Sequence, residues 1–355
     1  MRIWARWIRP FLRNLKNRIR PHRIRLSDQD VRAGGHRANF IDRFVVEERS
    51  YLDSVPEPLN PEIERLHVFA DRARWYLNDV DFFPSRGVLA QERRIVGDSK
   101  ANGALEDHAP LVAPLSRVEE DLWLPIGHQP WNYYHWLLED LPAIIRGFEA
   151  ESSLRVALPK NPPSFVKDSL NRLGVSFRSF SRPTRFAHVL LPGRGIDPGW
   201  PHRTDIALLA RFGEKVGGGP PREPSKKIMV SRRFSTRGLD NEEQLEHWAK
   251  NRGFDVVYAE NLSFAEQVRL FSEGHIILGS HGAGLANTVF SPRGASLLEI
   301  ASPRRADPCF ENLARVQGRP YRRIFASPGK LLDSTYLDEE GFDALESALV
   351  EVVDE

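Results

Sequence analysis

A glycine-rich turn carries the clearest chemical signal in the sequence. Ile276-Ile277-Leu278 is an apolar run too short for a helix, and Gly279 ends it. A polar pair and two more glycines follow, and the residues after them can be helical to Phe290. Glycine lets the backbone approach a ligand closely, and the free N–H groups and dipole of a helix N-terminus favour an anion. We therefore expect a strand, a tight turn and a helix start that bind a nucleotide diphosphate. The residues expected to form this site are Ser280, His281, Gly282, Ala283, Gly284 and Asn287.

A second cluster joins a histidine to two carboxylates. Asn132 is suited to cap a helix, and His135 and Glu139 then lie one turn apart on the same helical face, with Asp140 next in the chain. Such groups near a helix start can transfer a proton or bind a polyhydroxylated substrate. They can equally form a partly buried polar cluster that anchors the helix. Residue chemistry alone does not choose between these two interpretations.

Both clusters sit in a chain that alternates strands with helices. From residue 227 to residue 325 the pattern predicts five strands separated by helices, which is typical of a parallel, doubly wound sheet. Ligands of such sheets bind beyond the carboxyl ends of the strands. Arg232 and Arg233 follow the first of these strands, and Glu299 is near the end of the fourth. Arginine suits phosphate oxygens and a carboxylate suits ribose hydroxyls, although all three can also be surface residues.

The turn does not read as a dinucleotide site. Gly282-Ala283-Gly284-Leu285-Ala286-Asn287 lacks the third glycine of that fingerprint, and it follows a third strand where the fingerprint belongs after a first. A nicotinamide or flavin role is therefore disfavoured.

The expected domain organisation follows from the linker at residues 217–224, which is rich in glycine and proline. We expect an N-terminal segment at 1–30, an acceptor-side domain at 31–218, a linker at 219–225, a nucleotide-sugar-binding domain at 226–330 and a closing helix at 331–355. Asp79-Val80-Asp81 has a spacing that can hold a divalent cation, but it reads more readily as a turn.

Composition sets wider bounds. The chain has 355 residues, 41% apolar content, a net charge of +2 and one cysteine, Cys309, so we expect two domains, no nucleic-acid partner and no intramolecular disulfide. No apolar run approaches the length of a membrane span, and no secretory signal is evident. The first 27 residues hold no acid. Their arginines and apolar stripe, with two tryptophans, suit a helix at an anionic membrane surface, although Pro10 would kink it. A disordered basic tail and a helix docked on a partner subunit are the alternatives.

Three stretches together resemble glycosyltransferase family 61. They are Asn132-Tyr133-Tyr134-His135, Ser231-Arg232-Arg233 and His281-Gly282-Ala283-Gly284-Leu285-Ala286-Asn287, with Glu299 downstream. The resemblance covers roughly residues 110 to 325 and includes proteins of bacterial capsular polysaccharide biosynthesis. It implies an α/β fold of the GT-B type, with two Rossmann-like doubly wound domains facing a cleft, and inversion at the anomeric carbon without a required metal or other cofactor.

Carried over by position, the resemblance implies a role for each site residue. The turn at 281–284 would contact the donor diphosphate, Arg232 or Arg233 would neutralise the leaving group, and Glu299 would hold the ribose. His135 matches the family's histidine, and Glu139 falls where several relatives carry an aspartate. The next residue, Asp140, is also acidic, so the resemblance leaves open which of the two faces the cleft. The predicted protein is a peripheral, cytoplasmic transferase. It would move a hexosyl or pentosyl group from a nucleotide-diphosphate sugar, expected to be UDP-linked, to a glycan or lipid-linked glycan acceptor.

Rival interpretations remain at this point. A nucleotide-sugar 2-epimerase would keep the fold and consume donor without an acceptor. A non-catalytic scaffold of polysaccharide assembly would bind no nucleotide.

Overall fold

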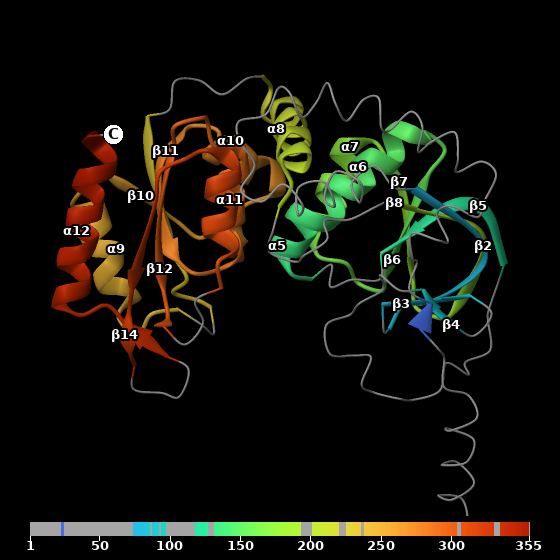
Figure 1. Cartoon of the computed structure of the whole chain (residues 1–355), viewed down its shortest axis with the longest axis horizontal. Helices are drawn as coiled ribbons and strands as arrows, with labels where there is room; N and C mark the ends of the chain where they lie inside the picture. Colours follow the sequence, from blue (N-terminus) through green and yellow to red (C-terminus); the bar gives the residue numbers. More distant parts are fainter. Residues whose placement is uncertain are drawn as a thin grey trace, which may run out of the picture. The chain divides into compact units, whose positions relative to one another are not determined.

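The computed structural model describes residues 23–24, 74–85, 87–91, 94–96, 118–126, 131–192, 201–219, 225–235, 238–303, 307–329 and 334–354. The chain divides into two compact units (Figure 1). The first comprises Met1–Trp131, Ala143–Pro163 and Gly174–Arg194, and the second comprises Asn132–Pro142, Ser164–Leu173 and Gly195–Glu355. Residues 1–22 of the expected N-terminal helix and most of the linker at 219–225 lie outside the described residues, whereas Arg23–Ile24, at the end of that segment, form a short strand.

The second unit contains the parallel sheet that the sequence predicts. Its strands are β9 (Lys226–Val230), β10 (Phe254–Val257), β11 (Gly274–Ser280), β12 (Ser296–Ala301) and β13 (Tyr321–Phe325). They lie in the order β10-β9-β11-β12-β13, and every neighbouring pair is parallel. Helices α9 (Glu242–Lys250) and α12 (Glu339–Asp354) cover one face of this sheet, and α10 (Phe264–Phe271) and α11 (Cys309–Gln317) cover the other (Figure 1). The alternating pattern of the sequence is thus confirmed as a doubly wound α/β layer structure.

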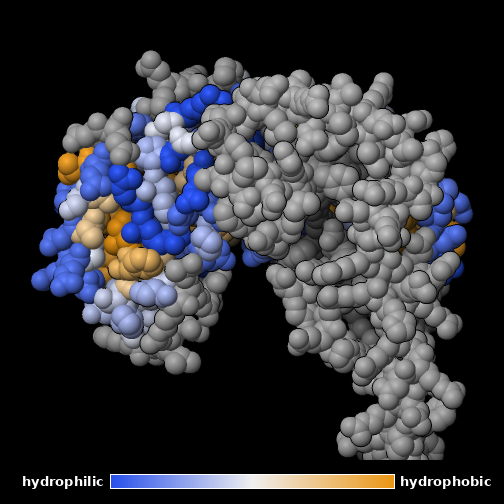
Figure 2. Space-filling view, in the orientation of Figure 1, coloured by the Kyte–Doolittle hydropathy of each residue, from blue (hydrophilic) through white to orange (hydrophobic). Residues whose placement is uncertain are grey.

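Local sequence signals explain where these helices begin and what they bury. The Ser263 hydroxyl accepts from the backbone N–H of Glu266, whose carboxylate accepts from the Ser263 N–H, so the predicted capping box forms at the start of α10. Along α12 the residues Leu345, Leu349 and Val352 pack into the core under the sheet. On the face of this unit that Figure 2 shows, the described residues are mostly hydrophilic, with small apolar areas. The predicted closing helix therefore buries its apolar stripe against the sheet.

The second unit also contains further helices and a small second sheet. The 3-10 helices η2 (Ala259–Asn261) and η3 (Ala283–Phe290) follow β10 and β11, and α8 (Arg203–Gly217) precedes β9. A two-stranded sheet pairs β14 (Ser327–Pro328) with β15 (Thr335–Tyr336). The helical run predicted after the glycine turn is present, but as η3 it is a 3-10 helix.

The first unit is built on a mixed sheet. Its strands are β1 (Arg23–Ile24), β2 (Arg74–Phe83), β3 (Val88–Gln91), β4 (Arg94–Val96), β5 (Val118–Pro125), β6 (Arg155–Pro159), β7 (Ser176–Phe180) and β8 (Thr184–Pro192). The order is β1-β4-β3-β2-β8-β5-β6-β7, with β8, β5, β6 and β7 parallel and β2 antiparallel to β8. Helix α6 (Leu141–Ala150) lies between β5 and β6 in the chain. Both units are thus mixed α/β structures with parallel strands, and the GT-B arrangement stays a prediction.

The expectation of a turn at Asp79-Val80-Asp81 is wrong. These residues lie inside β2, where Val80 is fully buried. Asp81 accepts two hydrogen bonds from the Arg185 guanidinium on β8, at 2.7 and 3.1 Å. Ladder pairing with β8 and burial of Val80 outweigh the local turn preference of aspartate.

Candidate functional site

The predicted diphosphate site lies where the strand order of the second sheet reverses. In sequence, β10 comes between β9 and β11, but in space β9 and β11 are neighbours. Arg232 follows the carboxyl end of β9, and the turn from His281 to Gly284 follows the carboxyl end of β11. Ligands of open α/β sheets bind at such a switch point, because the loops after the two neighbouring strands diverge there. Chain topology thus brings together the arginine and the glycine turn, 49 positions apart in sequence.

Arg232 binds the turn directly. Its Nη1 donates to the main-chain carbonyl of His281, and its Nη2 donates to the Ser235 hydroxyl at 2.8 Å. A Cβ atom at Gly282 would lie 2.5 Å from Arg232 Nη1 and 2.8 Å from its Cζ. Gly282 has an extended backbone, with φ at 179°, so glycine is needed there for space and not for a left-handed conformation. The missing side chain at Gly282 is what lets the guanidinium lie on the turn.

Gly284 has a different role. A Cβ atom at this position would lie 2.9 Å from Val230 Cγ1 on β9. The second glycine of the turn therefore lets η3 pack closely against the strand, and the first lets the arginine approach. Ala283, between them, is the first residue of η3, and the first N–H groups of a helix have no partner within it.

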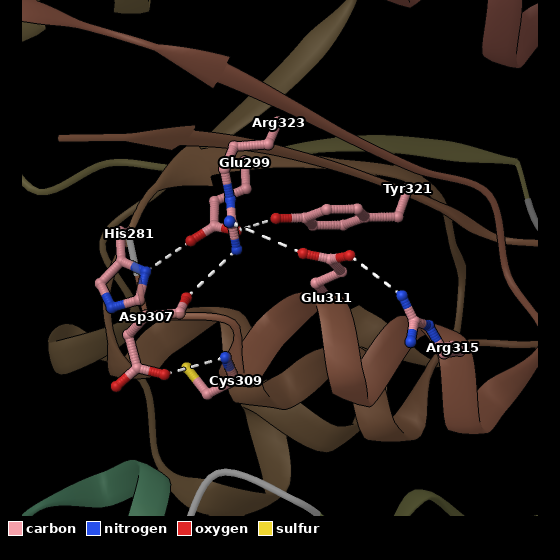
Figure 3. Close-up of polar contacts among 8 residues, drawn as sticks. All are labelled: His281, Glu299, Asp307, Cys309, Glu311, Arg315, Tyr321 and Arg323. Atoms are coloured by element: carbon pink, nitrogen blue, oxygen red, sulfur yellow. Dashed lines mark hydrogen bonds and ion pairs between the residues drawn. The ribbon is translucent and has the colours of Figure 1, made fainter. Parts of the chain in front are cut away.

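A buried carboxylate orients His281. The imidazole Nδ1 of His281 lies 2.5 Å from Glu299 Oε1 (Figure 3). Because a carboxylate oxygen accepts, Nδ1 carries the proton and donates it, and the other ring nitrogen, Nε2, is left for a ligand. Glu299 is fully buried and also accepts from the Tyr321 hydroxyl and, at 3.4 Å, from Arg323 Nε. Burial, together with the charge of Glu299, raises the pKa of Tyr321, which keeps its hydroxyl protonated as a donor. The structure thus gives Glu299 internal partners in place of the ribose predicted from the sequence.

Three other predicted site residues also have protein partners. Asn287 is fully buried and donates to the Gln267 carbonyl oxygen at 2.7 Å and to the Gly284 carbonyl at 3.1 Å. Ser280 is buried, with its hydroxyl 3.4 Å from Glu242 Oε2. Arg233 pairs with acids of α9 and not with the turn; its partner atoms are Glu243 Oε2 at 3.1 Å and Glu246 Oε2 at 3.4 Å. Of the two arginines, Arg232 is therefore the one that contacts the glycine turn.

Sequence reasoning missed two buried acids of α9. Glu242 accepts from the backbone N–H groups of Arg232, at 2.8 Å, and Leu239, at 3.0 Å. Glu246 accepts from the Ser231 hydroxyl at 2.7 Å and the Tyr258 hydroxyl at 3.0 Å. Both acids hold the loop that presents Arg232. The sequence does carry a signal for this pair, because two acids four residues apart at a helix start lie on the same helical face.

The His135–Glu139 cluster forms as the sequence predicts. The Asn132 side chain accepts from the Tyr134 N–H at 3.0 Å and caps α5 (Tyr133–His135). A π-helical turn, η1 (Trp136–Asp140), follows. Pro142 lies two residues after this turn and has no N–H to donate to the carbonyl four residues back, as a regular α-helix would require. His135 Nδ1 lies 2.9 Å from Glu139 Oε1.

Glu139 and Asp140 occupy different environments. The side chains of His135 and Glu139 are 17% and 18% exposed, whereas Asp140 is fully buried. The hydrogen bond to Glu139 raises the pKa of His135 against the effect of burial, and the charges of Glu139, Asp140 and Asp307 act in the same direction. Of the two acids, Glu139 is thus the one partly exposed to solvent, and Asp140 acts on His135 through its charge.

The two clusters belong to one compact unit. The Tyr133 hydroxyl donates to Asn287 Oδ1 on η3 at 2.6 Å. The Tyr134 ring meets the Phe310 ring edge-on with centroids 5.6 Å apart, and Phe310 lies 5.1 Å from the His281 ring. Residues 132–142 therefore pack with the glycine turn, although the sequence boundary at 219–225 would place them in the other domain.

The described part of the chain was compared with what a metal site and a membrane-spanning helix require. Within the described ranges, no group of three His, Cys, Asp or Glu side chains is placed to hold a metal ion. The described helices include none with the length and apolar content needed to cross a membrane.

The second unit is a doubly wound α/β structure. An arginine, a glycine turn and an oriented histidine lie at its switch point, which is where such folds bind ligands. Comparison with known sequences indicates which family of such proteins the chain resembles. The profile of the family Glycosyltransferase 61 matches residues 133–298, so the resemblance drawn from the motifs is confirmed over that segment.

Two relatives support this assignment over a shorter range. The chain is 35% identical over 107 residues to an EGF domain-specific O-linked N-acetylglucosamine transferase of Drosophila melanogaster, covering 29% of this chain and 20% of the relative. It is 32% identical over 127 residues to the alpha-1,3-arabinosyltransferase XAT3 of Oryza sativa subsp. japonica, covering 33% of this chain and 22% of the relative. The matched segment thus spans about a fifth of the length of each relative.

Proposed function

We propose that this protein is an inverting glycosyltransferase that moves a sugar from a nucleotide-diphosphate donor, UDP-linked, to a glycan acceptor. The observation that carries the proposal is Arg232 lying on the turn at His281–Gly284, beside a histidine fixed by Glu299. The match to the Glycosyltransferase 61 profile supports it, because that match covers both this turn and the His135–Glu139 pair.

Each group has a role in binding the donor. The guanidinium of Arg232, the N–H groups at the start of η3 and Nε2 of His281 surround the place where a diphosphate would lie. Glu299, buried and shared with Tyr321 and Arg323, keeps the imidazole in one tautomer. We infer that these residues bind the donor and stabilise the negative charge that develops as the nucleotide leaves.

The transfer is a single displacement. An acceptor hydroxyl oxygen forms the new bond to the anomeric carbon, the bond from that carbon to the diphosphate oxygen breaks, and its electron pair leaves with the nucleotide. The hydroxyl proton goes to the His135–Glu139 pair, 2.9 Å apart and partly exposed. No step requires a metal ion in this scheme.

Titration with UDP tests the proposal against its rivals. We expect calorimetric binding of UDP, and transfer of a sugar to a glycan acceptor from one of a panel of UDP-sugars. Absence of UDP binding would favour a non-catalytic scaffold. Donor consumption without any acceptor would favour the 2-epimerase.

The base assignment has its own test. Glu139→Gln and His135→Ala should each lower kcat by about 100-fold, the lower end of what a general base contributes. Glu351→Gln is the matched control, because this carboxylate pairs with Arg322 on the surface of α12. If Glu139→Gln and His135→Ala both kept full activity, the proton would go elsewhere.

The cellular setting is also a proposal. We propose that the protein works on the cytoplasmic face of a membrane in capsular or cell-surface polysaccharide synthesis, held there by residues 1–25. Vesicle co-sedimentation with and without those residues, using anionic and neutral lipids, tests this directly.

A further inference from the structure

We propose that Asp307 binds hydroxyl groups of the sugar being transferred, and so helps to determine which donor is used. The inference rests on the proposed function, since it places a group within that site.

Asp307 is held at a fixed place beside His281. Its main-chain carbonyl accepts from Arg323 Nη2 at 3.1 Å, and the same guanidinium lies 3.4 Å from Glu299, the partner of His281. One carboxylate oxygen, Oδ1, accepts from the Cys309 N–H at 3.0 Å. Figure 3 shows the side chain extending past the His281 ring, away from Glu299.

The same residue is tied to the other cluster. Asp307 lies two residues before α11 begins at Cys309, and Phe310 of that helix contacts both the His281 ring and the ring of Tyr134, the neighbour of His135. The negative charge of Asp307 is one of those acting on His135. Asp307 therefore lies within electrostatic reach of the proposed base and beside the proposed diphosphate site.

Chemistry restricts what an exposed carboxylate can bind at this place. It repels a diphosphate, and it accepts hydrogen bonds from hydroxyl groups. In a single displacement the transferred sugar is attached to the diphosphate and its anomeric carbon faces the base. The span between His281 and His135 is thus where the sugar must lie, and its hydroxyls are the donors that Asp307 would meet.

Asp307→Asn tests this with little structural change, because the amide keeps an oxygen for the Cys309 N–H. Calorimetry on the full chain would compare UDP with UDP-N-acetylglucosamine and UDP-arabinose, which carry the sugars in the relatives' names. We expect the Kd of UDP to stay within twofold of the wild-type value. In Asp307→Asn, the Kd of whichever UDP-sugar the wild-type protein binds more tightly should rise about tenfold, because one charge-assisted hydrogen bond to the sugar is lost.

Two further measurements keep the result interpretable. Asp343→Asn on α12 is the matched control and should change neither Kd. Asp307→Ser, which retains a short side-chain oxygen, should reproduce the effect and guards against misfolding of the first variant. Equal weakening of UDP and UDP-sugar, or no change in either, would overturn the inference. Failure of wild type to bind UDP would instead overturn the proposed function.

Discussion

Gly282→Ala is the sharpest test of how the turn works. The added methyl carbon would lie 2.5 Å from Arg232 Nη1, 2.8 Å from Cζ and 2.9 Å from Cδ. All three atoms belong to one long side chain, so the guanidinium would move and the backbone would stay. The backbone at Gly282 is extended, which alanine adopts without strain.

The expected magnitudes separate binding from stability. Moving Arg232 off the turn removes a charge-assisted contact to the diphosphate worth about 1.5–3 kcal/mol, so the Kd of UDP should rise about 10- to 100-fold. The free energy of unfolding should change by less than about 1 kcal/mol, because the loss of the Arg232 bond is offset by the lower entropy of the unfolded chain with alanine. Calorimetry with UDP and urea denaturation measure the two quantities.

Gly284→Ala is the matched control. Its methyl group would lie 2.9 Å from Val230 Cγ1 in packed surroundings, so it should destabilise the fold by about 1–3 kcal/mol. In the double variant with Arg232→Ala, Gly282→Ala should add almost nothing to the loss of UDP affinity, because both changes remove the same contact. Wild-type affinity in Gly282→Ala, alongside weak binding in Arg232→Ala, would refute the reasoning.

Two other predictions follow from the buried and partly buried pairs. The raised pKa of His135 means that its pairing with Glu139 stabilises the fold below pH 6.5 and that this contribution is lost as pH rises through the folded-state pKa. Glu139→Gln should therefore cost on the order of 1 kcal/mol near pH 6 and less near pH 9, as measured by urea denaturation at both values; an equal cost at both would contradict it. Glu299→Gln should destabilise the protein by about 3 kcal/mol, because it removes the buried charge that Arg323 and His281 face. A thermal midpoint equal to that of wild type would contradict this second prediction.

Much of the local structure could be predicted from the sequence. The five strands of the second sheet, the capping box at Ser263, the cap at Asn132 and the stripe of α12 follow from periodicity and side-chain chemistry within a few residues. The His135–Glu139 contact follows from the same rule, since a spacing of four residues defines neighbours on a helix. These features depend on interactions between residues near in sequence, which a pattern records directly.

Partners distant in sequence could not be predicted this way. The residues next to Glu299 in sequence do not indicate whether its carboxylate binds a ribose or pairs with His281, Tyr321 and Arg323. The partners of Glu299 depend on which strands become neighbours in the sheet. The stretch Asp79-Val80-Asp81, which lies inside β2, was likewise predicted as a turn, because its place in a strand comes from pairing with β8.

The sequence by itself determined that a glycine turn, an arginine pair and a histidine–carboxylate pair exist, because each is a short pattern with its own chemistry. Only the tertiary structure decided that Arg232, and not Arg233, lies on the turn, and that residues 132–142 pack with it in one compact unit. The physical reason is that strand order and close packing set which side chains meet, and both arise from the burial of apolar faces over the whole unit.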